Sequence, residues 1–183
     1  NTVGLRSAST VAHKAPPGLK GAAAVDREYT FSGVLGPQSE QDDVYERVAA
    51  PLVERLLEGQ NGLLFAYGVT NSGKSFSING EDGAPGIVPR ALTRIFERLA
   101  GTRAKLRLRY LEIYNEAIHD LLCEPENAIT RKKKALRLWQ DTRTGTIEVR
   151  GLSAHAIGSV EEGLALVAEG TRNRTCGATG LNA

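Results

Sequence analysis

The spacing of apolar and polar residues along the chain predicts strands that alternate with helices. Residues 61–67, "NGLLFAY", form a continuous apolar run flanked by glycine, which is typical of a strand buried on both faces of a parallel sheet. Residues 104–114, "AKLRLRYLEIY", alternate at first and then become continuously apolar, as a central strand does. Because helical patterns separate these runs, the class is α/β, and we expect a mostly parallel central sheet flanked by helices.

Three segments show the three- and four-residue spacing of amphipathic helices. Residues 42–58 form the first, and Pro51 is expected to kink it because proline has no amide N–H. The second begins at "KSFSING", is interrupted by "EDGAPG" and resumes over residues 87–100. The third follows Ser159, which forms a capping box with Glu162. The apolar stripes of the first two helices are Val44, Val48, Leu52 and Leu56, and then Leu92, Ile95, Phe96 and Leu99.

Shorter elements are expected between and before these helices. Residues 1–27 are rich in Ala, Gly, Ser and Pro, and we expect one short strand at residues 2–5 and a loop. "REYTFSGVLG" predicts a strand that runs into a turn. Residues 136–152 predict a hairpin that turns at Thr144–Gly145. Residues 123–135 are expected to form a polar loop that contains the basic cluster Arg131 to Lys134.

Composition narrows the class of protein further. The chain has 183 residues, enough for one domain with a substantial core, and a formal net charge of +2. So small a charge gives no global field for nucleic acid or membranes, and neither partner is expected. Cys123 and Cys176 form no metal or disulfide pattern, so a reducing, cytoplasmic compartment is the expectation. Since the sequence contains no methionine, we expect it to be a piece of a longer chain.

The stretch "GVTNSGKS", Gly68 to Ser75, matches the phosphate-loop pattern G-x-x-x-x-G-K-[ST]. Its glycines allow a tight turn that brings backbone N–H groups around an anionic phosphate, at the positive end of the following helix. Lys74 supplies a full positive charge to the outer phosphates, and the Ser75 hydroxyl can take one ligand position on Mg²⁺. The motif alone leaves ATPases, GTPases and small kinases open.

Four segments, in the right order, resemble kinesin motor domains. They are "YTFSGVLGPQSEQDDVYERVAAPLVERLLEGQNG", "NGLLFAYGVTNSGKSFSING", "RYLEIYNEAIHDLL" and "EEGLALVAEGTRNRTCGATGLNA". The resemblance runs from Tyr29 to Ala183, and "GVTNSGK" is closest to the mitotic kinesin-like (MKLP) branch. It implies a kinesin-type phosphate-loop NTPase fold truncated at both ends. Residues 1–183 would be a partial motor domain, with 1–27 a poorly ordered or edge segment and 28–183 the motor core up to the switch I loop.

The resemblance also implies roles for the matched residues. ATP and Mg²⁺ are the expected cofactors, with Ser75 on the metal and Phe76 beside the adenine, although Phe76 could instead be an ordinary core residue. Arg150 and His155 would face tubulin, whose acidic surface suits cationic side chains; the alternative for both is solvated surface charge. The residues expected around the triphosphate are Gly68, Val69, Thr70, Asn71, Ser72, Gly73, Lys74 and Ser75.

Two parts of the kinesin hydrolysis machinery have no counterpart in this sequence. The chain stops at Asn182-Ala183, the first two positions of the family's N-x-x-S-S-R-S-H loop, so we expect "xSSRSH" to follow directly. The family's Asp-x-x-Gly segment and its Arg-Pro strand have no match. These residues alone are therefore expected to bind nucleotide weakly and to hydrolyse little. The aspartates that do not begin an Asp-x-x-Gly segment are Asp26, Asp42, Asp43, Asp82, Asp120 and Asp141.

The function implied for the parent protein is that of an ATP-dependent microtubule motor, a mitotic or cytokinetic kinesin. It would act in the cytoplasm on microtubules, including those of the spindle, as a homodimer joined by a coiled coil outside this chain. Two alternatives remain. A kinesin-like scaffold without motor activity is disfavoured by the intact Lys74 and Ser75. Another phosphate-loop enzyme, such as a GTPase, should carry an N-K-x-D motif, and none is present.

Overall fold

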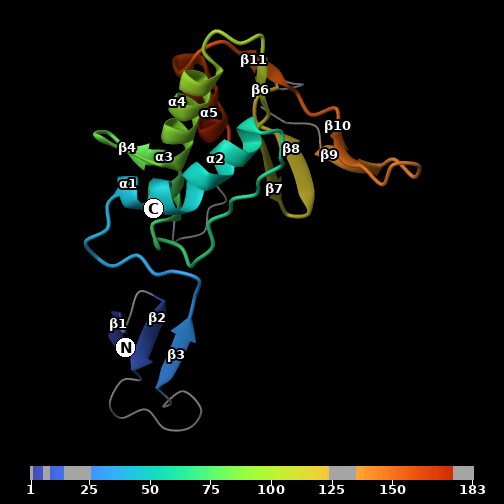
Figure 1. The fold of residues 1–183 in the computed structure, drawn as a ribbon. Helices are drawn as coiled ribbons and strands as arrows, with labels where there is room; N and C mark the ends of the chain where they lie inside the picture. Colours follow the sequence, from blue (N-terminus) through green and yellow to red (C-terminus); the bar gives the residue numbers. More distant parts are fainter. Residues whose placement is uncertain (1, 6–8, 15–25, 124–134, 175–183) are drawn as a thin grey trace. The chain divides into compact units, whose positions relative to one another are not determined.

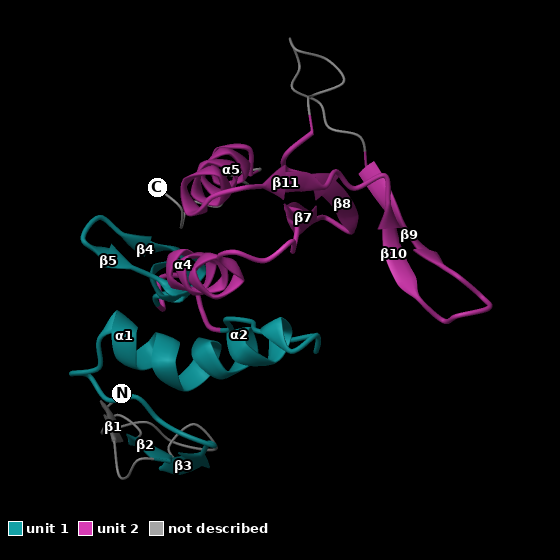
Figure 2. Ribbon diagram, turned by 45° about the horizontal axis from the view of Figure 1, so that its top comes forward, with its two compact units in different colours: residues 1–67, 73–88 teal, residues 68–72, 89–183 magenta. Residues whose placement is uncertain are grey.

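The computed structural model describes residues 2–5, 9–14, 26–123 and 135–174 (Figure 1). The chain divides into two compact units, coloured separately in Figure 2. Unit 1 comprises residues 1–67 and 73–88, and unit 2 comprises residues 68–72 and 89–183. The basic cluster at residues 131–134 and the last nine residues, including Cys176, lie outside the described part. The expected boundary between an edge segment at 1–27 and a motor core at 28–183 remains a prediction.

Unit 1 begins with a three-stranded antiparallel sheet in the order β1-β2-β3. The predicted strand at residues 2–5 is present as β1 (Thr2–Leu5). The sequence pattern did not predict β2 (Thr10–Lys14), which pairs with both neighbours. β3 (Arg27–Thr30) is shorter than the predicted strand, and the chain from Phe31 to Glu40 carries no strand or helix.

The first predicted helix is present but changes type before its proline. α1 (Gln41–Val44) continues into a π-helical turn, η2 (Tyr45–Ala49), and then into α2 (Ala50–Leu57). Pro51 lies in the first turn of α2, where a missing N–H is tolerated, and the wider turn before it accommodates the proline ring. The predicted apolar stripe, which begins at Val44, is not the buried face of this helix. The buried residues lie one position further along each turn and are Gln41, Tyr45, Ala49 and Val53.

The second predicted helix and its interruption are also confirmed. α3 (Lys74–Asn79) is followed by the two-residue strands β4 (Gly80–Glu81) and β5 (Ala84–Pro85). A Cβ at Gly80, which has a φ of +79°, would overlap the backbone of Ala84 and Gly86. Only glycine fits this tight return, and it directs the chain into α4 (Ile87–Leu99).

The strand predicted at residues 61–67 is wrong for this structure. The segment carries no helix or strand, and the side chains of Leu63, Phe65 and Tyr67 are 80%, 78% and 95% exposed. Every strand pairing among the described residues is antiparallel, so the mostly parallel sheet is not formed there either. The physical reason is that an apolar run becomes a strand only when neighbouring strands supply its backbone hydrogen bonds.

Unit 2 contains a four-stranded antiparallel sheet and a separate two-stranded one. The first has the order β10-β9-β8-β7, and the second pairs β11 with β6. Residues 104–114 therefore form two short strands in different sheets rather than one central strand. The predicted hairpin is confirmed as β9 and β10. The bounds are β6 (Leu106–Leu108), β7 (Leu111–Tyr114), β8 (Ala117–Asp120), β9 (Ala135–Gln140), β10 (Ile147–Arg150) and β11 (His155–Ile157).

The core of unit 2 lies where α5 (Val160–Arg172) packs on α4 and β11. A Cβ at Gly163 would lie 3.1 Å from Cδ1 of Leu92 and 3.4 Å from Cδ1 of Ile157, so the backbone of α5 approaches both elements closely. Half of the predicted capping box is present: Ser159 Oγ accepts from the backbone N–H of Glu162 at 3.2 Å. The carboxylate of Glu162 accepts from the N–H of Gly158 at 2.6 Å, one residue before the N-cap, and not from that of Ser159. Among the helices of the described residues, none is long and apolar enough to cross a bilayer.

Candidate functional site

The first part of the phosphate loop, Gly68–Ser72, belongs to unit 2 and forms an exposed turn. The backbone N–H of Ser72 donates to the carbonyl of Val69 at 3.2 Å. Asn71 adopts the left-handed conformation, with a φ of +64°, which asparagine tolerates better than most residues. A Cβ at Gly68 would lie only 2.5 Å from Ser72 Oγ, so a larger residue at Gly68 would open the turn.

The second part of the loop, from Gly73 onward, belongs to unit 1 and starts α3. Gly73 is the N-cap residue and has a φ of +87°, and its carbonyl accepts from the N–H of Ser77 at 2.8 Å. An ideal Cβ at Gly73 would meet no atom within 4 Å, so glycine is needed here for its backbone angle and not for space. Lys74 is half-buried at the first helical position, and Ser75 follows it on the exposed surface.

Phe76 lies on the first turn of α3 and is 45% exposed. Its carbonyl accepts a 2.7 Å hydrogen bond from Nε2 of Gln41. Gln41 is buried in α1, and its Oε1 has no hydrogen-bond partner among the described residues. This residue was not singled out from the sequence, yet it connects α1 to the helix of the phosphate loop. An available signal was a glutamine in line with the buried stripe of that helix.

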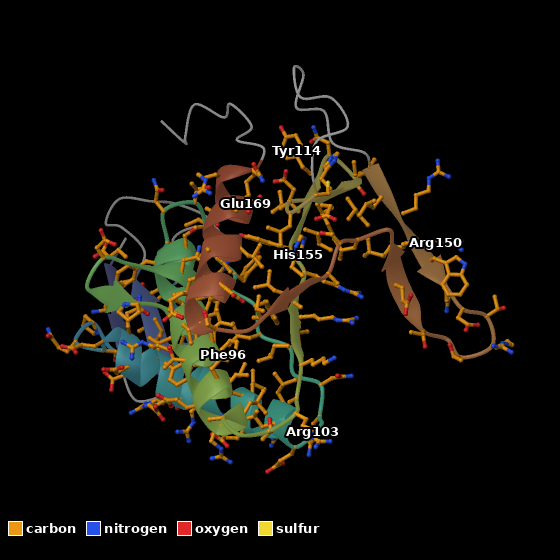
Figure 3. The ribbon with its side chains drawn as sticks, turned by 90° about the horizontal axis from the view of Figure 1, so that it is seen from above. Phe96, Arg103, Tyr114, Arg150, His155 and Glu169 are labelled. Carbon is orange, nitrogen blue, oxygen red and sulfur yellow. The ribbon has the colours of Figure 1, made fainter. Side chains whose placement is uncertain are left out.

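Arg150 ends β10 on the hairpin that follows the basic segment (Figure 3). Its guanidinium lies 5.7 Å from the ring centroid of Trp139 on β9, within the range of a cation–π contact. Both side chains are exposed. Such a contact at an exposed site contributes about 0.5–1 kcal/mol, and it favours an arginine position over the Trp139 ring.

His155, labelled in Figure 3, begins β11 and is half-buried. It belongs to unit 2, as Arg150 does. Its Nε2 lies 3.0 Å from Oγ of Ser153. Ser153 in turn binds the buried carboxylate of Asp120 through its backbone N–H and its hydroxyl. The sequence pattern did not single out Asp120 and Ser153. A carboxylate at the end of an apolar strand, followed by two leucines, was the signal that could have identified the first.

Ser75, Lys74 and the backbone at Gly73 have the chemistry that a nucleotide with Mg²⁺ needs. No group of three or more His, Cys, Asp or Glu side chains that could hold a metal occurs in the described ranges. The exposed hydroxyl of Ser75 is a hard oxygen donor of the kind Mg²⁺ prefers, and Mg²⁺ is commonly held by one or two protein ligands plus phosphates and water. Lys74 and the backbone at Gly73 would hold the phosphates, and bound Mg²⁺ would neutralise phosphate charge.

Comparisons with known proteins point to one family. The family described as "Kinesin motor domain" matches residues 9–183. Kinesin-like protein KIN-5C of Arabidopsis thaliana is 37% identical over 177 residues, which cover 86% of this chain and 17% of that protein. Kinesin-like protein 5 of Schizosaccharomyces pombe is 40% identical over 162 residues, which cover 86% of this chain and 18% of the relative. The chain spans less than a fifth of the length of these relatives.

Two solved structures of KIF14 in complex with a microtubule, one with ADP and one a two-heads-bound dimer with AMP-PNP, share the fold. Each has a TM-score of 0.81 and 31% sequence identity, and the matches cover 98% and 97% of this chain and 51% and 50% of the KIF14 chains. The fold and the loop together define a phosphate-loop NTPase of the kinesin type. The chain belongs to the kinesin motor-domain family.

Proposed function

We propose that these residues are part of an ATP-dependent microtubule motor, in which the segment from Gly68 to Ser75 holds the triphosphate. The observation that carries the proposal is the loop itself. Gly73 takes a left-handed conformation directly before α3, which puts Lys74 and Ser75 on the first helical turn. Lys74 supplies charge, Ser75 supplies an oxygen ligand, and exposed Phe76 can stack on a base.

The microtubule-facing part of the proposal rests on unit 2. Arg150 is exposed and held against Trp139, and His155 is half-buried on the next strand. Only residues 151–154 separate them in the sequence, although their strands, β10 and β11, belong to different sheets. An acidic partner surface favours such cationic side chains and is recognised faster at low salt. The two KIF14 structures, which are microtubule complexes, support this choice of partner.

The finer assignments follow the same proposal. The protein would act as a mitotic or cytokinetic kinesin of the MKLP branch, on cytoplasmic and spindle microtubules, with ATP and Mg²⁺ as cofactors. It would work as a homodimer through a coiled coil outside these residues, and the KIF14 dimer with two bound heads supports this arrangement. Membership of the kinesin family disfavours an unrelated phosphate-loop enzyme, while intact Lys74 and Ser75 disfavour a scaffold without nucleotide turnover.

The test is phosphate release from ATP by the chain extended with its native flanking sequence, measured with and without microtubules. We expect stimulation by microtubules in the unaltered protein and its loss in Lys74→Ala. Lys74→Arg retains the charge but changes its shape, and should keep more nucleotide affinity than Lys74→Ala. Tight microtubule binding without any ATP turnover would instead identify a non-motile kinesin-like protein.

A further inference from the structure

The strongest unassigned feature of unit 2 is the buried carboxylate of Asp120, at the end of β8. Its side chain is 2% exposed. Oδ1 accepts from the backbone N–H of Leu122 at 2.9 Å and from the hydroxyl of Ser153 at 3.1 Å. Oδ2 accepts from the backbone N–H of Ser153 at 2.7 Å. A buried carboxylate is costly unless its oxygens are occupied, so these bonds fix both the backbone and the side chain of Ser153.

The direction of these bonds assigns the proton on His155. A serine hydroxyl has one proton, and a carboxylate can only accept, so the hydroxyl proton of Ser153 points at Asp120. His155 Nε2 lies 3.0 Å from the same Oγ. Because the hydroxyl proton is already committed, Oγ must accept from Nε2. The proton of the neutral ring is therefore on Nε2.

The bonds between Asp120 and Ser153 lie next to the strand that carries His155. His155 pairs with Leu108 across the two-stranded sheet, which fixes its backbone. The connection of residues 151–154 leads back to Arg150 on the hairpin. Ser153 is the residue of this connection that is bound to the core, through Asp120. It therefore sets where the ring of His155 stands relative to its own strand.

We propose that Ser153, held by Asp120, is a positioning residue for microtubule binding. It fixes the orientation of the His155 ring by accepting from Nε2–H, so that Nδ1–H of the protonated ring can donate to an acidic side chain of the partner surface. This inference rests on the proposed function, since it takes His155 to face the microtubule. It predicts that Ser153 acts through His155 and not through nucleotide chemistry.

The first test reads the ring directly. In the chain extended with its flanking sequence, the ¹⁵N chemical shifts of the His155 ring at alkaline pH should show a proton on Nε2. Ser153→Ala should shift the ring toward a mixture of tautomers, and Ser153→Thr, which keeps a hydroxyl, should restore the original signal. A wild-type ring that carries its proton on Nδ1 overturns the proposal without any variant.

The second test is a double-mutant cycle on microtubule affinity. Ser153→Ala should weaken binding about three- to ten-fold, the effect of one hydrogen bond, while kcat at saturating microtubules stays unchanged. In a His155→Ala background the same substitution should have no further effect. Equal weakening in both backgrounds overturns the proposal, because Ser153 would then act on the fold in general. Thermal unfolding of Ser153→Ala checks that the backbone bonds to Asp120 keep the chain folded.

Failure of the proposed function and failure of this inference give different results. If the proposed function is wrong, the unaltered protein shows no microtubule-stimulated phosphate release. If only the present inference is wrong, stimulation is normal but Ser153→Ala binds microtubules as the wild type does, or its ring spectrum does not change.

Discussion

The side-chain amide of Asn173, at the end of α5, donates a 2.9 Å hydrogen bond to the backbone carbonyl of Leu121. Leu121 is fully buried and directly follows Asp120, whose carboxylate holds Ser153. One short buried segment of unit 2 therefore fixes both the end of α5 and the approach to β11. The helix end and the candidate microtubule-facing strand are anchored at neighbouring residues.

Removing the amide of Asn173 should loosen the end of α5. Asn173→Ala leaves the buried carbonyl of Leu121 without this donor, which costs about 1–3 kcal/mol. Asn173→Asp keeps the size but replaces the donor with an acceptor, and should cost at least as much. Urea unfolding measures the loss, and hydrogen exchange of the last turn of α5 locates it. Wild-type midpoints for both variants would show that the bond is not important for stability.

Substitution of Ser75 should change the requirement for Mg²⁺. Ser75→Ala removes the oxygen ligand, so the Mg²⁺ concentration for half-maximal nucleotide binding should rise. We expect a rise of at least about ten-fold, because the loss of even an outer-shell partner lowers metal affinity by about 10–100-fold. Ser75→Thr keeps the hydroxyl and should behave like the wild type, since the loop pattern accepts either residue. Nucleotide affinity measured across a Mg²⁺ titration separates the two variants, and identical curves would remove Ser75 from the metal site.

Arg150 and Arg103 are two exposed arginines of unit 2 with different expected effects (Figure 3). Arg150→Ala should weaken microtubule binding about two- to ten-fold and reduce the dependence of that binding on salt. The reason is that the variant loses a positive charge that is proposed to face the acidic surface of the partner. Arg103→Ala, on the connection between α4 and β6, should leave the affinity unchanged. Co-sedimentation at two salt concentrations gives the measurement. Equal effects would mean that general positive charge, and not Arg150, attracts the microtubule.

A methyl group at Gly170 should destabilise α5, although alanine is normally the better helix former. Gly→Ala in an exposed helix adds about 0.5–1 kcal/mol of stability. At Gly170, however, the new Cβ would overlap the ring of Tyr110, and such overpacking costs about 1–3 kcal/mol. Gly170→Ala should therefore lower the unfolding midpoint. In a Tyr110→Ala background, Gly170→Ala should destabilise the protein much less, because the ring that the new Cβ would overlap is gone. If Gly170→Ala alone stabilised the protein, Tyr110 could not lie as close to the backbone of α5 as the structure has it.

Ser159 and Glu161 at the start of α5 predict a pH effect. A hydrogen bond from its own backbone amide, followed by one from Ser159, lowers the pKa of Glu161. Since the folded pKa lies below the unfolded one, the stabilisation is complete above the unfolded pKa and is lost as the pH falls through the folded pKa. Ser159→Ala should raise the pKa of Glu161 part of the way and cost about 1 kcal/mol in lost capping.

The comparison for this prediction is Ser159→Thr, which keeps the hydroxyl. NMR titration of the Glu161 carboxyl gives the pKa in each variant, and urea unfolding at neutral and acid pH gives the stability. The gap between the wild type and Ser159→Ala should narrow in acid. A Glu161 titration that Ser159→Ala leaves unchanged would remove the serine as a cause of the lowered pKa.

The sequence alone determined the features that a few adjacent residues decide. The turn of the motif from Gly68 to Ser75, the N-cap at Ser159 and the hairpin turn at Gly145 are local, because backbone angles and short-range hydrogen bonds specify them. The helices α3, α4 and α5 were predicted within a few residues of their ends. The order of four motifs along the chain was enough to recognise the kinesin family, which the comparisons confirm.

Only the tertiary structure decided the features that depend on distant partners. Whether residues 61–67 form a strand depends on a neighbouring strand to share hydrogen bonds, and apolar residues alone do not supply one. Which stripe of the first helix is buried depended on what packs against it. Asp120 and Ser153 are 33 positions apart, so no local pattern could link them. Hydrogen bonds and packing between residues far apart in the chain exist only once the chain has folded.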